Sequence, residues 1–267
     1  MRIGIIGLGN MAAAMIGGML GKGLVKPQDI IGSCRTVATA EKVKARFQIS
    51  VAESNAKAAE AAQLLILAVK PGVIFHAARE IREAAAPGTL VVSVAAGISL
   101  SRLKEAFGRP DLKYVRCMPN MPALVMEGCT GICAGEEVTE EELGRVTELM
   151  ESFGKAYVVP ERLMDVVVSV SGSAPAYVFM LIEAMADGAV AGGMPRKQAY
   201  EFAAQAVLGS ARMVLDTGIH PGELKDMVCS PGGTTIQAVK VLEEKGLRAA
   251  VMSAMEVCRK ASEELQG

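Results

Sequence analysis

The chain is short of several residue types, and each shortage argues against a class of function. It has no tryptophan and only 4% aromatic residues among its 267, so we expect a core of alanine, valine, leucine, isoleucine and methionine. The formal net charge of -1 argues against a nucleic-acid partner, which would need a basic surface. No apolar run approaches the ~20 residues of a membrane span, so we expect no membrane contact. Histidine occurs twice. His76 is expected at the surface of a helix outside every motif, and His220 begins a His-Pro turn, so neither position is typical of a general acid.

The six cysteines are scattered, and no pair has the two-residue spacing of zinc or redox motifs. Cys129 and Cys133, the nearest two, are separated by Thr130-Gly131-Ile132. We therefore expect reduced thiols and no metal site, as is typical of a cytoplasmic protein. The residues after Arg2 form a short apolar run and a glycine turn rather than a signal peptide, which favours the same location.

The first twenty residues predict a strand, a glycine turn and a helix with no spacer between them. Gly7 allows the tight turn, Gly9 leaves room for a pyrophosphate, and Ala12 lets the helix pack close to the strand. A cofactor's phosphates would then lie at the helix N-terminus, among free N–H groups. The alternative is a glycine turn that only connects a strand to a helix.

Apolar runs alternate with helix-like segments as far as Pro160, which predicts a doubly wound parallel sheet. The fold class is therefore α/β, with a Rossmann-type dinucleotide-binding domain over residues 1–160. A capping box at Thr139 predicts the start of a helix that ends near Phe153. After the first strand, the expected strands are Ile30–Ser33, Ile49–Val51, Leu64–Val69, Thr89–Val94, Tyr114–Cys117, Thr130–Ala134 and Ala156–Val159.

Residues 161–267 show almost no strand alternation and predict an all-α C-terminal domain. One of its helices is rich in alanine and glycine, which lets helices approach closely. Because the domain is small, we expect it to bury part of its apolar surface against a second copy, giving a homodimer. The alternative is a self-sufficient helix bundle. The expected helices are Arg162–Ser171, Ala174–Gly192, Arg196–Thr217, Thr234–Lys245 and Leu247–Leu265.

The end of the second strand predicts which nicotinamide cofactor binds. Counting about twenty residues from the glycines reaches Asp29, but Asp29 precedes the strand and so lies at the wrong end of the sheet. The residues after the strand include Ser33 and Arg35 and no carboxylate that would repel a phosphate. Arg35 offers several donors to a 2′-phosphate, so NADP(H) is favoured and NAD(H) is the alternative. Arg35 could equally be an ordinary surface arginine.

Three further strand ends are expected at the same edge of the sheet. Lys70 follows a buried strand directly, and small residues follow the next strand at Ala95. Two prolines hold Asn120 in an extended loop within Arg116–Pro122. Together with the glycine turn we interpret these ends as one pocket, although Lys70 could equally be a solvated side chain.

The most specific stretch is Cys229–Ile236, in which a proline and two glycines precede a predicted helix. Free N–H groups at that helix start, together with nearby hydroxyls, would form a socket for a carboxylate. The alternative interpretation is a helix cap with a glycine-rich approach.

These motifs together resemble the pyrroline-5-carboxylate reductase family, in the family's order and spacing from one end of the chain to the other. The resemblance implies reduction of 1-pyrroline-5-carboxylate, a cyclic imino acid, to L-proline by hydride transfer from NAD(P)H, the last step of proline biosynthesis. It also implies a dimer with interleaved C-terminal helices, often assembled into a decamer. The matching stretches are Gly7–Ala14, Ala68–Pro71, Arg116–Pro122, Ser171–Tyr177, His220–Gly222 and Ser230–Ile236.

The resemblance also implies roles for individual residues. The pyrophosphate loop would be Gly7, Gly9, Asn10 and Met11, with Ser33 and Arg35 facing the adenosine phosphate and Asn55 near the ribose. Ala68 and Lys70 would lie along the ribose and nicotinamide, with Ala95 and Cys117 nearby. Ser230 and the N–H groups of Gly233 and Thr234 would hold the substrate carboxylate, and the Thr235 hydroxyl, the catalytic contact, would bind the ring nitrogen. Some relatives have alanine at Thr234, so its side chain is a weaker candidate.

Two other functions are compatible with the same two-domain plan. One is an NADP-dependent reductase of hydroxy or keto acids, which would need a catalytic lysine or histidine in the helical domain. Lys197, Lys225 and Lys240 are available there, but none lies in a motif. The other is a non-catalytic NADP-binding sensor, against which the carboxylate socket argues. An imine can take its proton from water, so the shortage of histidine favours imine reduction.

Overall fold

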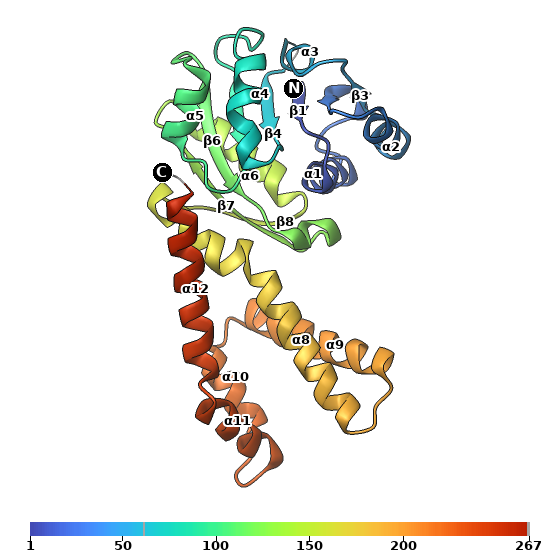
Figure 1. The fold of residues 1–267 in the computed structure, drawn as a ribbon, viewed down its shortest axis with the longest axis vertical. Coiled ribbons are helices and arrows are strands. Elements are labelled where there is room, and N and C mark those ends of the chain that lie inside the picture. The colour runs from blue at the N-terminus through green and yellow to red at the C-terminus, as the bar shows by residue number, and fades with distance from the viewer. Residues whose placement is uncertain (61, 266–267) are drawn as a thin grey trace. The chain divides into compact units, whose positions relative to one another are not determined.

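The computed structural model describes residues 1–60 and 62–265, and its elements follow one another as drawn in Figure 1. Contacts divide the chain into two compact units. The first contains Met1–Ser173 together with Cys258–Gly267, and the second contains Ala174–Val257. The sequence-based division after Pro160 follows the change in composition and stays a prediction.

The first unit is built on one eight-stranded sheet in the order β3-β2-β1-β4-β5-β6-β7-β8. The first six strands follow the order of a doubly wound dinucleotide-binding sheet, which confirms the predicted fold class. The strand order reverses between β1 and β4, which both pair in parallel with their neighbours. The strands are β1 Ile3–Ile6, β2 Ile30–Ser33, β3 Ser50–Val51, β4 Leu64–Leu67, β5 Leu90–Ser93, β6 Lys113–Met118, β7 Gly128–Ala134 and β8 Gly154–Val158.

One strand pairing differs from the predicted all-parallel sheet. β7 runs antiparallel to β6, with Arg116 opposite Cys133. The connection between them holds only a short 3₁₀ helix, Met121–Val125. A parallel return needs a crossover of a dozen or more residues, so this short connection makes the chain reverse direction. β8 then pairs with β7 in parallel.

Side chains from the sheet enter a hydrophobic core on each face. Ile3 and Ile5 of β1 belong to one cluster and Ile6 belongs to the other, as the alternation of side chains along a strand requires. Because both faces are covered, the four residues of β1 are all buried, as are those of β4 and β5. This rigid double-sided core fixes the strand ends from which the polar site residues project.

The helices of the first unit begin where the sequence supplies caps. The Thr36 and Ser99 side chains accept from the backbone N–H groups of Thr39 and Arg102. Thr139 and Glu142 form the predicted capping box. The helices are α1 Asn10–Gly21, α2 Val37–Phe47, α3 Asn55–Glu60, α4 Ile74–Ile81, α5 Leu100–Phe107 and α6 Glu140–Glu151, with 3₁₀ turns at Pro27–Asp29 and Pro71–Val73.

The predicted single helix Arg162–Ser171 is divided into three pieces. A 3₁₀ turn, Glu161–Leu163, leads into α7, Met164–Val167, and then into a π-helical turn, Val168–Gly172. The wide turn is closed by the N–H of Ser173, which donates to the Val168 carbonyl oxygen five residues back at 2.8 Å. Sequence periodicity does not report such a local change in winding.

The second unit consists of helices, as predicted, with one that the sequence analysis missed. We had interpreted His220-Pro221 as a turn, but Pro221 is the first residue of a helix, and the His220 Nδ1 atom accepts from the Gly222 N–H at 3.1 Å. The helices are α8 Ala174–Ala191, α9 Arg196–Thr217, α10 Pro221–Val228, α11 Thr234–Glu244 and α12 Leu247–Glu264, the last of which ends in the first unit.

The helices of the second unit leave most of their apolar side chains exposed within one chain. Their buried cluster consists of Ala186, Ala199 and Ala203 where α8 packs on α9. The helical stretch Glu161–Ala191 is long and apolar enough to cross a membrane by length and composition alone. The expectation that no apolar run approaches that length was therefore wrong, because Val166–Ile182 contains no charged residue.

Candidate functional site: a dinucleotide cavity and a glycine-rich helix start

A cavity of about 460 Å³ opens at the carboxyl ends of β1, β2 and β4, where the strand order reverses. This is the position at which doubly wound sheets bind their ligands. Side chains and backbone from several segments, far apart in the sequence, meet around it. Seven of the predicted cofactor residues line it: Gly7, Gly9, Ser33, Arg35, Asn55, Ala68 and Lys70.

Glycine occupies positions 7 and 9 of the first turn for different structural reasons. Gly7 has a φ of +94°, and a Cβ there would lie 2.8 Å from the Ala68 carbonyl oxygen, so the turn requires glycine for folding. A Cβ on Gly9 would meet nothing within 4 Å. Gly9 caps α1 without a side-chain hydrogen bond to the first turn. It therefore leaves open space beside the N-terminus of a long helix, where a phosphate binds well.

The cavity carries two cations that are not committed to carboxylates. Arg35 and Lys70 are exposed and line the cavity, and within residues 1–60 and 62–265 neither forms an ion pair. Asp29 lies before β2, and its carboxylate accepts from the Lys26 N–H at 3.0 Å. It therefore caps a turn at the other end of the strand, as the sequence analysis expected.

A chain of hydrogen bonds crosses one wall of the cavity and includes residues that the sequence analysis did not select. The Ser33 hydroxyl donates to Asn55 Oδ1 at 2.6 Å, and Asn55 Nδ2 donates to Glu80 Oε2 at 2.5 Å. Glu80 Oε1 lies 3.0 Å from Nε2 of His76. No carboxylate follows β2 directly in the sequence, as expected, but α4 brings Glu80 to the cavity from much later in the chain.

The helical spacing of His76 and Glu80 was the available signal for this wall. Residues four apart share a helix face, and Pro71 places their helix directly after β4. His76, which we had interpreted as an isolated surface residue, is exposed and also lines the cavity. The other lining residues that were not selected are Leu8, Cys34, Thr36, Thr39, Val69 and Val73.

Four predicted cofactor residues lie outside the residues that line this cavity. Asn10 is exposed at the first position of α1, Met11 is half-buried beside the core, and Ala95 is buried after β5. Cys117 is fully buried in the core, where burial raises the pKa of its thiol. Any contact of Cys117 with a nicotinamide ring would therefore be made by its backbone atoms and not by its thiol.

The loop after β6 is tied down by Asn120, which is buried and extended. Its Oδ1 accepts from the Cys129 N–H at 2.8 Å, and its Nδ2 donates to the Ser171 carbonyl oxygen at 3.1 Å. The Ser171 hydroxyl in turn donates to the Cys129 carbonyl oxygen at 3.1 Å. Asn120 thus connects the end of β6, β7 and the π-helical turn, with both ends of its amide engaged.

Arg116, in the same motif, is buried with 1% of its side chain exposed. Its terminal nitrogens lie 3.7 Å from Glu161 Oε1 and 3.8 Å from Asp165 Oδ1, and within the described residues they have no hydrogen-bond partner. Glu161 accepts from the Leu100 N–H at the start of α5, and Asp165 accepts from the Ser262 hydroxyl in α12. The guanidinium therefore holds together two carboxylates that bind other elements of the first unit.

In the second unit, the loop before α11 forms a tight turn against the helix start. The Gly233 N–H donates to the Ser230 carbonyl oxygen at 3.0 Å, so this N–H, which we had assigned to a substrate carboxylate, is already used. A Cβ on Gly233 would lie 2.4 Å from Ser230 Oγ, which shows how closely the serine hydroxyl approaches the turn. Gly233 caps α11 without a side-chain bond, and Thr234 and Thr235 are the first two residues of the helix.

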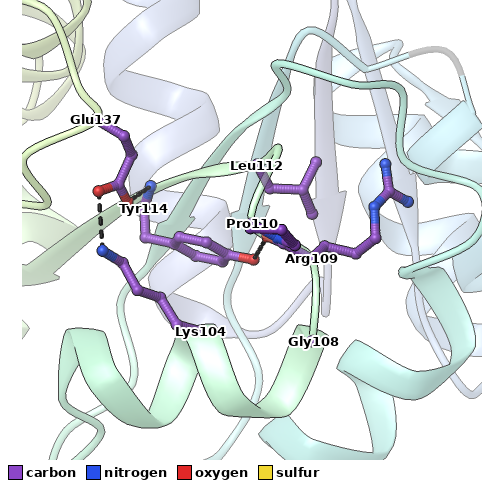
Figure 2. A pocket seen from close by; sticks show the side chains of 7 residues that line it. All are labelled: Lys104, Gly108, Arg109, Pro110, Leu112, Tyr114 and Glu137. Carbon is purple, nitrogen blue, oxygen red and sulfur yellow. Dashed lines mark hydrogen bonds and ion pairs between the residues drawn. The ribbon is translucent and has the colours of Figure 1, made fainter.

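A second cavity, of about 300 Å³, lies at the other end of β6 (Figure 2). Its polar groups bind one another: the Tyr114 hydroxyl donates to the Arg109 carbonyl oxygen, and Lys104 pairs with Glu137. Burial raises the pKa of Tyr114 to about 12. Arg109 is paired with Asp111. Among the described residues, the cations that line this cavity are thus committed to carboxylates, unlike Arg35 and Lys70 at the carboxyl ends of the strands.

Within the described part of the chain, no group of three histidine, cysteine, aspartate or glutamate side chains is arranged to hold a metal ion. All six cysteines are free thiols. The Cys133 pKa is raised to about 12, first by burial and then by the nearby Glu161 carboxylate. Neither Cys117 nor Cys133 is therefore set up as a thiolate ligand or nucleophile.

Comparison with known proteins covers both units. A family model described as pyrroline-5-carboxylate reductase dimerisation matches residues 161–265, and one described as NADP oxidoreductase, coenzyme F420-dependent, matches residues 2–97. The pyrroline-5-carboxylate reductase of Escherichia coli (strain K12) is 52% identical over 264 residues, covering 99% of this chain and 98% of the relative.

Solved structures agree over the same length. A pyrroline-5-carboxylate reductase from Coxiella burnetii has a TM-score of 0.93 and 32% identity, covering 100% of this chain and 98% of that chain. The Plasmodium falciparum pyrroline carboxylate reductase, solved with NADP bound, has a TM-score of 0.87 and 27% identity over 100% of this chain and 98% of that chain. These full-length matches, together with the fold and cavity of the present chain, show that this chain belongs to the pyrroline-5-carboxylate reductase family of NAD(P)H-dependent oxidoreductases.

Proposed function

We propose that this chain reduces 1-pyrroline-5-carboxylate to L-proline. The observation that carries the proposal is the cavity at the strand-order reversal, with its open Gly9 and its two uncommitted cations, in a chain that is 52% identical to an enzyme of that name. A hydroxy- or keto-acid reductase and a non-catalytic NADP sensor are not favoured, because neither accounts for the full-length match.

The cofactor proposed is NADPH, with NADH as the alternative. The cavity fits a dinucleotide phosphate, since Gly7 and Gly9 open the α1 N-terminus and Arg35 follows the strand that reads the adenosine ribose. Lys70 lies on the same cavity and adds a second positive charge. The NADP bound in the P. falciparum structure supports the same choice.

The residues of this chain bind and orient rather than donate protons. When bound, the reduced nicotinamide supplies the hydride for the imine carbon. Ser230 and the N–H of Thr234 hold the substrate carboxylate at the start of α11, and the Thr235 hydroxyl binds the ring nitrogen. We withdraw the Gly233 N–H from this set because it is bonded within the turn. The imine can take its proton from water, so this reaction does not require a histidine as general acid.

The proposed assembly is a homodimer, formed through the helical domain that the dimerisation model matches. The exposed apolar side chains of α8 and α9 support this interface. The family resemblance further supports a decamer, a cytoplasmic location, and the absence of nucleic-acid and membrane partners. It also supports functional domains at 1–160 and 161–267. Light scattering of the purified protein measures the assembly directly.

One assay tests the reaction. Consumption of NADPH is followed by absorbance with 1-pyrroline-5-carboxylate and, separately, with a panel of keto acids. We expect turnover with the imine and none with the keto acids. Turnover with a keto acid alone would identify the hydroxy-acid reductase, and tight NADPH binding without any turnover would identify the sensor.

A further inference from the structure

The Glu80 carboxylate determines the direction of the hydrogen bonds along one wall of the dinucleotide cavity. A carboxylate only accepts hydrogen bonds, so the Asn55 side chain must turn its NH₂ group toward Glu80. The amide oxygen of Asn55 then faces Ser33, and it too can only accept. The Ser33 hydroxyl must therefore give its single hydrogen to Asn55.

This direction leaves Ser33 with only lone pairs for a ligand. Ser33 is the last residue of β2, where the 2′ position of the adenosine ribose is read. A ribose 2′-hydroxyl can donate to those lone pairs, but a 2′-phosphate cannot. To bind a phosphate, the hydroxyl must break its 2.6 Å bond to Asn55, and the Glu80 charge lies next along the chain of bonds.

We propose that Glu80 is a specificity-determining residue that acts through Asn55 and Ser33. We call the two hydrogen bonds from Ser33 to Asn55 and from Asn55 to Glu80 the relay. By fixing the direction of the relay, Glu80 favours NADH and opposes the preference for NADPH that Arg35 provides. The proposal rests on the cofactor site assigned above. His76 pairs with Glu80, and Arg35 and Lys70 line the same cavity. The negative charge of Glu80 therefore acts beside basic side chains that attract a phosphate.

The test compares two variants that lose the same charge. Glu80→Met removes both the charge and the acceptor, which frees Asn55 to turn around. Glu80→Gln removes the charge but keeps an oxygen that accepts from Asn55. The measured quantity is the ratio of kcat/KM with NADPH to kcat/KM with NADH. We expect Glu80→Met to raise this ratio roughly tenfold, the scale of one hydrogen bond to a charged group, and Glu80→Gln to leave it within about threefold.

A matched control and a second site sharpen the result. Glu83→Gln removes a carboxylate that is 81% exposed and does not line the cavity. It should leave kcat/KM unchanged with both cofactors. Ser33→Ala should weaken NADH more than NADPH, because only NADH uses the serine lone pairs. The opposite order would overturn the relay. Equal shifts in the two Glu80 variants would assign the effect to charge alone and overturn it as well.

Other outcomes are equally decisive. If Glu80→Met lowers both kcat/KM values in parallel, Glu80 is only a structural contact and the proposal fails. If the unmodified protein turns over the imine with neither cofactor, the proposed function fails instead. In that case the dissociation constants of NADPH and NADH, measured by nucleotide fluorescence, still test the relay in the same variants.

Discussion

In the first unit, apolar side chains from both faces of the sheet enter two large buried clusters, whereas in the second unit the buried cluster consists of three alanines. The larger side chains of the second unit, such as Met180 and Phe202, stay exposed in the single chain. Helices with such faces need another surface to cover them. The first unit therefore encloses its own core, and the exposed faces of the second fit the proposal that another copy covers them.

The largest expected effect tests this difference directly. Phe202 is 61% exposed in α9 of the second unit, and Val37 is 75% exposed in α2 of the first. Phe202→Glu should raise the dimer dissociation constant about 100-fold or more, because roughly 1.5–3 kcal/mol of burial is lost in each copy. Val37→Glu should leave it unchanged. Sedimentation measures both, and equal behaviour of the two variants would remove the contrast between the units.

Within the first unit, the two glycines of the cofactor turn should separate folding from binding. Gly7→Ala places a Cβ against the Ala68 carbonyl oxygen at positive φ and should cost about 2–5 kcal/mol of unfolding free energy. Gly9→Ala should unfold at the same urea concentration as the parent protein but bind NADPH roughly tenfold more weakly. Urea denaturation and nucleotide titration check the pair. A stable Gly7→Ala protein would contradict the steric reason given for Gly7.

Arg116 tests whether the first unit depends on buried charge as well as on apolar packing. Arg116→Met should lower the unfolding free energy by about 2 kcal/mol, because Glu161 and Asp165 lose their cation. The cost stays below that of a fully buried pair since Glu161 is 38% exposed. Arg82→Met, at an exposed ion pair, is the control and should change stability little. Equal losses of unfolding free energy in the two variants would show that the buried Arg116 contributes no more to stability than the exposed Arg82.

For the second unit, the loop before α11 should affect the reaction more than the fold. Thr235→Ala should lower kcat/KM for the imine roughly tenfold or more, the size of one transition-state hydrogen bond. Thr235→Ser, which keeps the hydroxyl, should recover most of the activity. NADPH binding should be the same in all three proteins, and unchanged kinetics in the alanine variant would remove Thr235 from the site.

The smallest expected effect concerns the cavity of Figure 2. Tyr114 has a pKa raised from 10.0 to about 12, chiefly by burial. Because the folded-state value is the higher one, its contribution to stability is complete below about pH 10 and is lost as the pH rises toward 12. In an alkaline absorbance titration, one of the four tyrosines should ionise late, and Tyr114→Phe should remove that step. Four tyrosines titrating together would contradict it.

Local patterns predicted the strands, the caps and the glycine turn because each depends on residues close together in sequence. The Thr139 capping box and the Arg196–Thr217 helix were predicted at the observed residues. The antiparallel β7 and the π-helical turn before Ser173 were missed, since pairing direction and winding depend on connection length and tertiary packing.

The site residues show the same contrast between positions that local sequence predicts and positions that tertiary packing decides. Ser33 and Arg35 follow a strand, so their position at the cavity could be predicted from the strand alone. Glu80 reaches the same wall from α4, which follows α3 only after β4 and a 3₁₀ turn. The spacing of His76 and Glu80 indicates a shared helix face, but the contact of Glu80 with Asn55 depends on tertiary packing. The turn bond of the Gly233 N–H also depends on backbone geometry that the sequence letters do not display.

The chain leaves the first unit after Ser173 and returns to it at Cys258, and the Cys258 thiol contacts the Ser173 hydroxyl at 3.2 Å. In terms of connectivity, the helical unit is thus an insertion whose two junctions are neighbours. Replacing Ala174–Val257 with a short peptide would leave the nucleotide module continuous, together with its own last helical turns. The same junction would accept a different helical insert, so one nucleotide module could be grafted onto new partners for assembly and substrate choice.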